Sequence, residues 1–171
     1  MADVKIETGN ANYMFENGIL YGNEKKEVLF CEKGIVGEVQ IAEGAMEVKD
    51  FAFSGCAGIT GIKIPESVTT IGNLVFSGCS GLTSIKIPES VTTIGNSVFS
   101  GCSGLTNIKI PESVTTIEDW VFSGCSGLTD IELSEHVTTI GDRAFYNCSS
   151  LTELKIPKSI TSIGRYTFSS F

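Results

Sequence analysis

The sequence has no apolar run near the roughly 18 residues that a membrane span needs, and it does not begin with the basic and apolar segments of a signal peptide. Basic side chains are also scarce, because 12 Lys and Arg stand against 20 Asp and Glu, for a formal net charge of -8. Such a surface repels phosphate backbones, so nucleic acid is not an expected partner. We expect either a cytoplasmic protein or one whose export signal has been removed.

Residues that carry enzyme chemistry are few. His136 is the only histidine, and a catalytic triad would need it beside an activated serine and a carboxylate. The chain has no nucleophile-elbow spacing, no phosphate-binding loop with its lysine, and no Cys-x-x-Cys pair that could start a metal site. The sequence therefore predicts no enzyme, no catalytic residue, no metal and no cofactor. With 42% hydrophobic residues in 171, it predicts one folded domain.

A strict internal repeat dominates the rest of the chain. The unit 64–86 matches the unit 87–109 at 21 of 23 positions, and the unit 110–132 matches 87–109 at 18 of 23. Tandem units of this length predict a solenoid in which each unit packs against its neighbours. Three columns recur every 23 residues: Cys56, Cys79, Cys102, Cys125 and Cys148; Phe30, Phe53, Phe76, Phe99, Phe122, Phe145 and Phe168; and Val36, Ile59, Leu82, Leu105, Leu128 and Leu151.

Each unit alternates apolar and polar residues and then breaks at a proline. Ile85 and Ile87 alternate with Lys86, which indicates a short strand with one buried face. Strands stacked once per unit must be parallel, so we expect about six of them, at 36–41, 59–64, 82–87, 105–110, 128–133 and 151–156. A second extended piece at 91–94 follows, and the spacing of Val98, Phe99 and Cys102 favours one helical or 3₁₀ turn.

The pattern Leu-x-x-Ile-x-Ile-Pro-x-x-Val-x-x-Ile-Gly-x-x-x-Phe-x-x-Cys resembles the BspA-like, or Treponema-type, leucine-rich repeats over roughly residues 36–171. The resemblance implies an α/β repeat solenoid: a curved, right-handed, non-catalytic superhelix with 23-residue units, of a kind typical of surface proteins and adhesins. It also implies a cell-surface or secreted location.

The segment before the repeats is expected to cover their apolar end. Residues 13–21, a polar turn at 22–26 and residues 27–30 are predicted to form a β-hairpin cap, which terminal repeats need. The predicted organisation is a tail and cap over 1–35 and repeats over 36–171, with the last unit incomplete, in one structural domain.

The cysteine column is interpreted as a ladder of buried thiols that behave as small apolar groups. Adjacent coils lie about 5 Å apart, so disulfide pairing between coils is conceivable but not required. Cys31 stands outside the column and is expected to be the most accessible thiol, although still partly buried.

Several carboxylates are expected to share one patch. Asp130 and Glu132 lie two apart on one predicted strand, with Glu135 beyond them and Glu153 one strand over. A divalent cation could bridge them, but lysines flank the patch and a strand offers no encircling loop of oxygens. Pairing between lysine and glutamate on neighbouring strands is the favoured interpretation.

Two columns differ in nearly every unit: Phe51, Leu74, Ser97, Trp120, Arg143 and Tyr166; and Glu38, Gly61, Ser84, Asn107, Asp130 and Glu153. Neutral drift explains variation at exposed sites, but a rigid frame that displays varied side chains also suits the binding of a macromolecule, and Trp, Tyr and Arg are enriched in binding hot spots.

We therefore expect a protein-binding module, a surface adhesin or ligand-binding domain that acts through its strand face. The alternative is a structural spacer, a self-associating unit or an intracellular scaffold. The predicted binding residues are Asn107, Lys109, Asp130, Glu132, Glu153 and Lys155, with Trp120 on another face.

Overall fold

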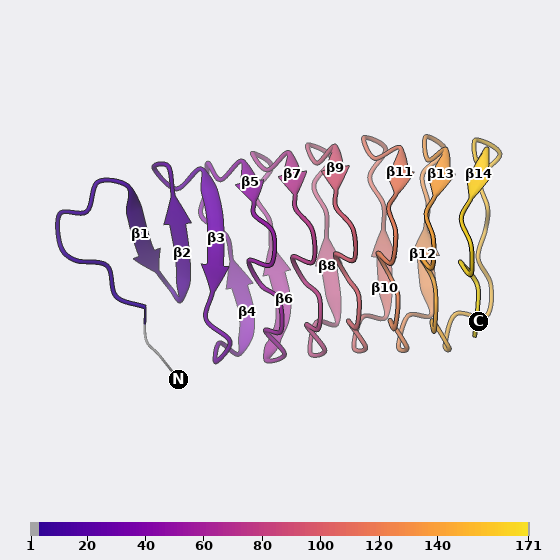
Figure 1. The fold of residues 1–171 in the computed structure, drawn as a ribbon, viewed down its shortest axis with the longest axis horizontal. Helices are drawn as coiled ribbons and strands as arrows, with labels where there is room; N and C mark the ends of the chain where they lie inside the picture. The colour runs from indigo at the N-terminus through magenta and orange to yellow at the C-terminus, as the bar shows by residue number, and fades with distance from the viewer. Residues whose placement is uncertain (1–3, 171) are drawn as a thin grey trace.

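The computed structural model describes residues 4–170, which wind into an elongated solenoid of parallel strands (Figure 1). The first strand of each coil belongs to one sheet, in the order β12-β10-β8-β6-β4. The second forms a row that is split into the sheets β1-β2-β3-β5-β7-β9 and β11-β13-β14. The strands are β1 (Tyr13–Glu16), β2 (Ile19–Gly22), β3 (Glu27–Cys31), β4 (Gly37–Gln40), β5 (Glu47–Val48), β6 (Ile59–Lys63), β7 (Thr70–Ile71), β8 (Ser84–Lys86), β9 (Thr93–Ile94), β10 (Asn107–Lys109), β11 (Thr116–Ile117), β12 (Asp130–Glu132), β13 (Thr139–Ile140) and β14 (Ser162–Ile163).

The register follows the repeat. From Glu38 onward, strand partners are separated by 23 residues, as in the pairs Asn107 with Asp130 and Ile71 with Ile94, whereas β3 and β5 pair at a separation of 20 residues. Every strand pair from β3 onward is parallel. The parallel solenoid that the repeat predicts is therefore confirmed.

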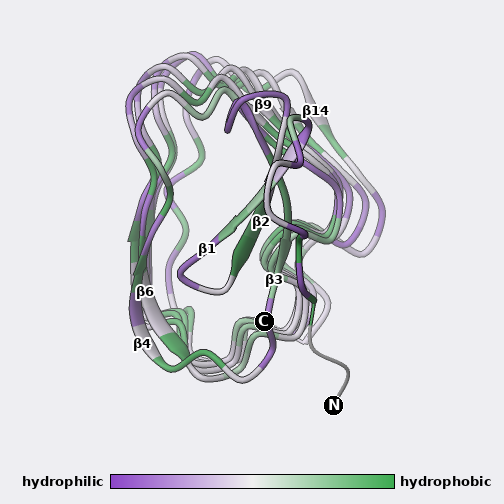
Figure 2. Ribbon diagram, turned by 90° about the vertical axis from the view of Figure 1, so that its left-hand side faces the viewer, coloured by the Kyte–Doolittle hydropathy of each residue, from purple (hydrophilic) through white to green (hydrophobic). Residues whose placement is uncertain are grey.

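The N-terminal segment differs in detail from the predicted hairpin. Residues 13–21 do not form one strand, because Asn17 and Gly18 have φ values of 50° and 76° and reverse the chain between β1 and β2. An Asn-Gly pair with both φ values positive is the favoured two-residue hairpin turn. The result is a three-strand antiparallel meander whose last strand, β3, pairs with β5. Viewed along the solenoid, the meander lies across the first coil (Figure 2).

The turn after each second strand is not helical. Residues 4–170 contain strands and turns but no helix. This part of the chain therefore has no helix long and apolar enough to cross a membrane. The expectation of a helical or 3₁₀ turn is wrong because two residues per unit adopt left-handed backbone, which breaks a helical path. They are the varied column of Phe51, Leu74, Ser97, Trp120, Arg143 and Tyr166, and the column of Gly55, Gly78, Gly101, Gly124, Asn147 and Ser170.

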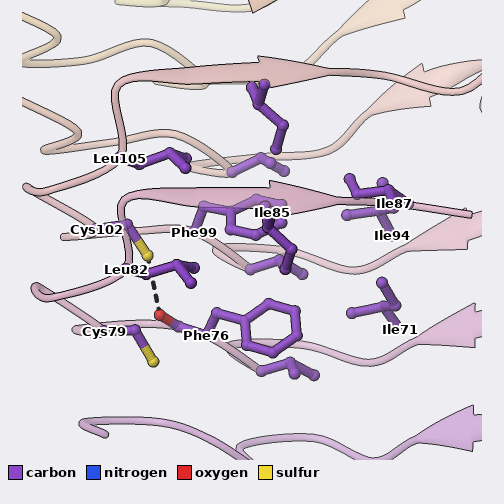
Figure 3. Packing of buried hydrophobic residues seen from close by; sticks show 14 of the residues in the cluster. Ile71, Phe76, Cys79, Leu82, Ile85, Ile87, Ile94, Phe99, Cys102 and Leu105 are labelled. Atoms are coloured by element: carbon purple, nitrogen blue, oxygen red, sulfur yellow. Dashed lines mark hydrogen bonds between the residues drawn. The ribbon is translucent and has the colours of Figure 1, made fainter. Parts of the chain in front are cut away.

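The core consists of columns that run the length of the solenoid, and Figure 3 shows members of these columns from neighbouring coils. The rings of Phe53, Phe76, Phe99, Phe122 and Phe145 are fully buried, and consecutive centroids lie 5.4 to 5.5 Å apart. The column ends are less covered than the repeat predicts: Phe30 is partly buried, and Phe168 is 37% exposed. Val36 was expected in the buried aliphatic column but is 77% exposed, because Gly37 takes the position opposite Ile59.

The thiols add polar links to this core. Each of four cysteines donates an S–H bond of 3.1 Å to the carbonyl of a phenylalanine in the preceding coil, as Cys102 does to Phe76 (Figure 3); the others are Cys79, Cys125 and Cys148. Cys31 is 1% exposed and the other five cysteines are 0% exposed, so Cys31 is buried like the rest and the expected accessibility is not observed. It lies beside Cys56 beneath the cap, and all six cysteines are free and buried.

One glycine column sets how closely the second strands approach. A Cβ atom at Gly95 would lie 2.7 Å from the carbonyl carbon of Gly72, and at Gly141 it would lie 2.7 Å from the carbonyl carbon of Glu118. Glu118 occupies this column itself, where a side chain forces the coil away from its predecessor. The sheet breaks at this step, between β9 and β11, and Figure 1 shows the wider gap.

A second glycine column controls the first strands. A Cβ atom at Gly127 would lie 2.3 Å from the carbonyl oxygen of Ser103, and the same approach recurs at Gly81 and Gly104. The last unit carries Ser150 in this column. Residues 151–156, which follow it, do not form the sixth predicted strand, so the sheet has five strands and ends at β12.

Candidate protein-binding surface

The outward side of the five-stranded sheet, called here the strand face, displays the polar columns of the repeat. Asn107 pairs with Asp130 and Lys109 with Glu132 in the register of β10 and β12, and all four residues are exposed. The alternation of strand side chains explains this, because the intervening Ile108 and Ile131 point into the core. Four of the predicted binding residues therefore lie side by side.

Glu153 and Lys155 also reach this region, but from a different backbone. They lie on the segment 152–158, which runs past β12 without pairing with it. Between β12 and this segment lies an open groove of about 680 Å³. Its lining includes the predicted residues Asp130, Glu132, Glu153 and Lys155, whereas Asn107 and Lys109 lie just outside it on β10.

The groove carries more negative than positive charge. Its lining holds four carboxylates, of Asp130, Glu132, Glu135 and Glu153, against the ammonium groups of Lys155 and Lys158. Glu132 binds Lys109 at 2.9 Å, and this contact raises the pKa of the lysine. Within the described part of the chain, no other charged group of the groove makes an ion pair, so these groups are available to a partner.

The lysine column supports the pairing interpretation of the carboxylates. Lys63 lies 3.3 Å from Glu38 on the neighbouring strand, and Lys86 lies 3.9 Å from Glu66, which follows the neighbouring strand β6. Among residues 4–170, no three His, Cys, Asp or Glu side chains are arranged to hold a metal ion. The sole histidine, His136, is exposed, and its backbone N–H donates to Ser134.

Trp120 lies outside the strand face, on the left-handed turn column, which we call the turn face. The guanidinium carbon of Arg143 lies 4.7 Å from the Trp120 ring centre and 4.8 Å from that of Tyr166. Tyr146 packs at 6.2 Å from Trp120. Trp120 is 38% exposed and Tyr166 61% exposed, so both side chains are accessible to solvent. The sequence places all three residues in one varied column but does not show that they stack.

The repeat itself identifies the family. Residues 39–171 match the model described as BspA type Leucine rich repeat region, in six copies. The chain belongs to the BspA-type leucine-rich repeat family. No curated protein matches the sequence. The resemblance to BspA-like repeats is therefore confirmed, and leucine-rich repeats of this kind are typically non-catalytic modules of protein interaction.

Solved structures of leucine-rich repeat proteins share the fold of this chain. A leucine-rich repeat protein from Eubacterium ventriosum is 28% identical, with a TM-score of 0.73 over 96% of this chain and 51% of its own. A leucine rich cell surface protein from Faecalibacterium prausnitzii is 24% identical, with a TM-score of 0.66 over 96% of this chain and 53% of its own. The T. pallidum Leucine Rich Repeat protein is 24% identical, with a TM-score of 0.62 over 94% of this chain and 86% of its own. The chain spans about half the length of the first two.

The sequence did not predict every residue of the groove beside β12. Lys158 and Leu133 line it but were not predicted, because the sixth strand was expected to pair with β12 and close the gap. The signal that could have revealed the gap is Ser150, which replaces the glycine of Gly58, Gly81, Gly104 and Gly127.

Proposed function

We propose that this chain is a protein-binding module of a surface adhesin or ligand-binding protein, and that the partner docks on the strand face over the groove beside β12. The observation that carries the proposal is the groove itself, which gathers Asp130, Glu132, Glu153 and Lys155 around a volume of about 680 Å³. A relative of similar fold is described as a cell surface protein, and the proposal extends that location to this chain.

The charge pattern supports a selective contact. A lysine column runs along the strand face through Lys63, Lys86 and Lys109 and is interrupted by Glu132. Opposite charges side by side favour a partner with the complementary pattern, which governs selectivity and association rate more than affinity. We therefore expect association to weaken as salt is raised.

The test is a binding screen of the purified chain against host matrix proteins and cell surfaces, followed by charge reversal. The double variant Asp130→Lys/Glu132→Lys should abolish binding to any partner found. Glu24→Lys/Glu43→Lys makes the same change in net charge at exposed positions away from the groove, and it should bind normally. Binding that survives the first variant but is lost in Trp120→Ala would move the site to the turn face.

A second function has a specific observation in its favour. The last coil exposes apolar side chains, with Ile156 at 41%, Ile163 at 45% and Phe168 at 37%. An exposed solenoid end of this kind suits a spacer that stacks on further repeats or on another copy. Concentration-dependent sedimentation that Ile163→Lys abolishes would support this role over the first.

A further inference from the structure

The edge of β12 that faces the groove carries backbone groups without partners. At the preceding step of the sheet, the amides of Thr129 and Asp130 donate to the carbonyl of Thr106, and the amide of Ile110 donates to the carbonyl of Glu132. The equivalent donors one unit later are Thr152, Glu153 and Leu133. None of these three amides has a backbone acceptor within the described residues.

These free groups form a regular row. In a parallel ladder, alternate residues turn their N–H and C=O groups toward the same neighbour. Residues 130 and 132 of β12 face β10, as the bonds from Asp130 to Thr106 and from Ile110 to Glu132 show. The carbonyl of Thr129, both backbone groups of Ile131 and the amide of Leu133 therefore face the groove, and all three residues line it.

The chain keeps this edge open through a side chain. Ser150 stands where Gly127 and its equivalents approach the backbone of the preceding coil, with Cβ positions 2.3 to 2.6 Å from a carbonyl oxygen. A serine Cβ atom needs more room, so the last unit moves outward immediately before residues 151–156. In this last coil Ile156 is 41% exposed, whereas its equivalents Ile110 and Leu133 are 0% and 9% exposed.

We propose that the open edge of β12 binds an extended, basic segment of a partner protein as an added β-strand. This inference rests on the proposed function and specifies how the partner is recognised. Strand addition to an exposed edge uses main-chain hydrogen bonds for affinity and alternate side-chain positions for specificity.

The groove defines the pattern of the added segment. Asp130 and Glu132 point to one face of the edge, so a strand beside them places lysine or arginine at alternate positions opposite these carboxylates. Intervening side chains point toward the apolar side of the groove, where Ile131, Leu133 and Ile156 lie. The segment bound at this edge should therefore alternate basic and apolar residues, beginning and ending with a basic one.

The probe is the peptide Ac-Lys-Val-Lys-Val-Lys-NH₂, added to the intact chain and followed by NMR-detected hydrogen exchange and by titration. In the free protein, the Leu133 amide should exchange at least about tenfold faster than its bonded equivalent at Ile110. Added peptide should protect Ile131 and Leu133. N-methylation of the three central residues keeps the charge but removes the donors, and should weaken binding about tenfold or more.

Two variants test the cause of the open edge. Ser150→Gly should let residues 152–156 pair with β12, protect Leu133 without peptide and reduce peptide binding. Ser149→Gly removes a neighbouring, exposed serine and should leave Leu133 exchange and peptide binding unchanged.

Charge recognition is tested separately. The variant Asp130→Lys/Glu132→Lys should bind Ac-Glu-Val-Glu-Val-Glu-NH₂ in place of the basic peptide.

Other outcomes overturn the inference in distinguishable ways. If Leu133 is protected in the free protein at every concentration, the chain's own segment 152–156 occupies the edge. If that protection rises with protein concentration, a second copy occupies it. If the N-methylated peptide binds as well as its parent, strand addition fails but charge recognition by the strand face stands. If neither peptide binds, the inference fails, and the screen against protein partners decides the proposed function separately.

Discussion

The buried thiols show how a single residue type acquires a role from its position in the coil. Cys79, Cys102, Cys125 and Cys148 were expected to behave as small apolar groups, but each also donates to a phenylalanine carbonyl one coil earlier. These bonds connect consecutive coils through the core, where competing water is excluded. The cysteine column therefore contributes both packing and a directional link.

Substitution of Cys102 tests this link. Cys102→Ser keeps a donor within reach of the Phe76 carbonyl and should lower the unfolding free energy by about 1 kcal/mol, through poorer packing. Cys102→Ala loses both the donor and the sulfur contacts, so we expect about 2 kcal/mol. Urea denaturation of the two variants beside the parent measures the difference. A serine variant less stable than the alanine variant would contradict the bond.

The same thiols should make stability fall in alkaline solution. Burial raises the pKa of Cys79 and of Cys148 to about 12, whereas the pKa of a thiol in an unfolded chain is about 8.5. Above that pH, the unfolded state releases protons that the folded state keeps, so unfolding becomes more favourable up to the folded pKa. Between pH 7.5 and 9.5 each such thiol should cost about 1.4 kcal/mol.

Urea titrations at these two pH values provide the measurement. Cys79→Ser removes one ionisable thiol and should reduce the loss of unfolding free energy by about 1.4 kcal/mol. Equal stability of the parent at both pH values would show that the thiols are not held in their neutral form. Rapid alkylation of Cys79, Cys102 or Cys125 in the native protein would lead to the same conclusion.

At the scale of a strand, glycine positions decide whether neighbouring coils pair. Gly72, Gly95, Gly141 and Gly164 leave room for close approach, and the residue in this column at the β9 to β11 step is Glu118. A second row of hydrogen bonds, from backbone amides to Asn and Asp side chains of the preceding coil, breaks at the same step. The amides of Asn96 and Asp142 make such bonds, to Asn73 and Asp119. The amide of Asp119 makes none among the described residues. One added side chain thus interrupts two rows of hydrogen bonds.

Glu118→Gly should close this break. Restored bonds between β9 and β11 outweigh the added flexibility of the glycine, so we expect the unfolding free energy to rise by about 1 kcal/mol. The Thr115 amide, which has no backbone acceptor in the described chain, should become protected from exchange. Gly141→Glu is the matched opposite and should open the next step and destabilise the protein. If the Thr115 amide is already protected in the parent, the explanation is wrong.

For the whole molecule, the two ends of the solenoid differ in how they are covered. The cap places Ile19, Tyr21 and Val28 in the core, and the Tyr21 hydroxyl accepts a bond of 3.1 Å from the Ala42 amide. At the other end, β14 is exposed on both of its residues, and segment 151–156 forms no strand. Repeat proteins lose stability where a neighbour interface is missing.

Unfolding should therefore spread from the C-terminal end. Amides of residues 151–156 should exchange faster than those of residues 82–87, because the former open without disrupting a complete coil. Native-state hydrogen exchange as a function of denaturant measures both sets in one sample. Slower exchange at 151–156 would reverse the order and would mean that the last coil is more firmly held than its contacts indicate.

The sequence by itself determined the repeat, the parallel order of the strands and the aromatic and thiol columns. Each 23-residue unit has one apolar face per strand and is too small to form a core alone. Stacking against the neighbouring units is what buries that face. The identities of the exposed columns followed for the same reason. Asn107, Asp130, Lys109 and Glu132 lie together because stacking in register places equivalent positions of adjacent units side by side.

Only the tertiary structure decided the features that depend on the spacing between coils. Glu118 and Ser150 read in the sequence as minor departures from a repeat, but the cost of a Cβ atom depends on how far away the preceding backbone lies, here under 3 Å at the equivalent glycines. The same holds for Cys31, which the sequence leaves outside the column and the fold buries beneath the cap. Distances between segments far apart in the chain arise only when the coils pack, and they leave no periodic pattern in the sequence.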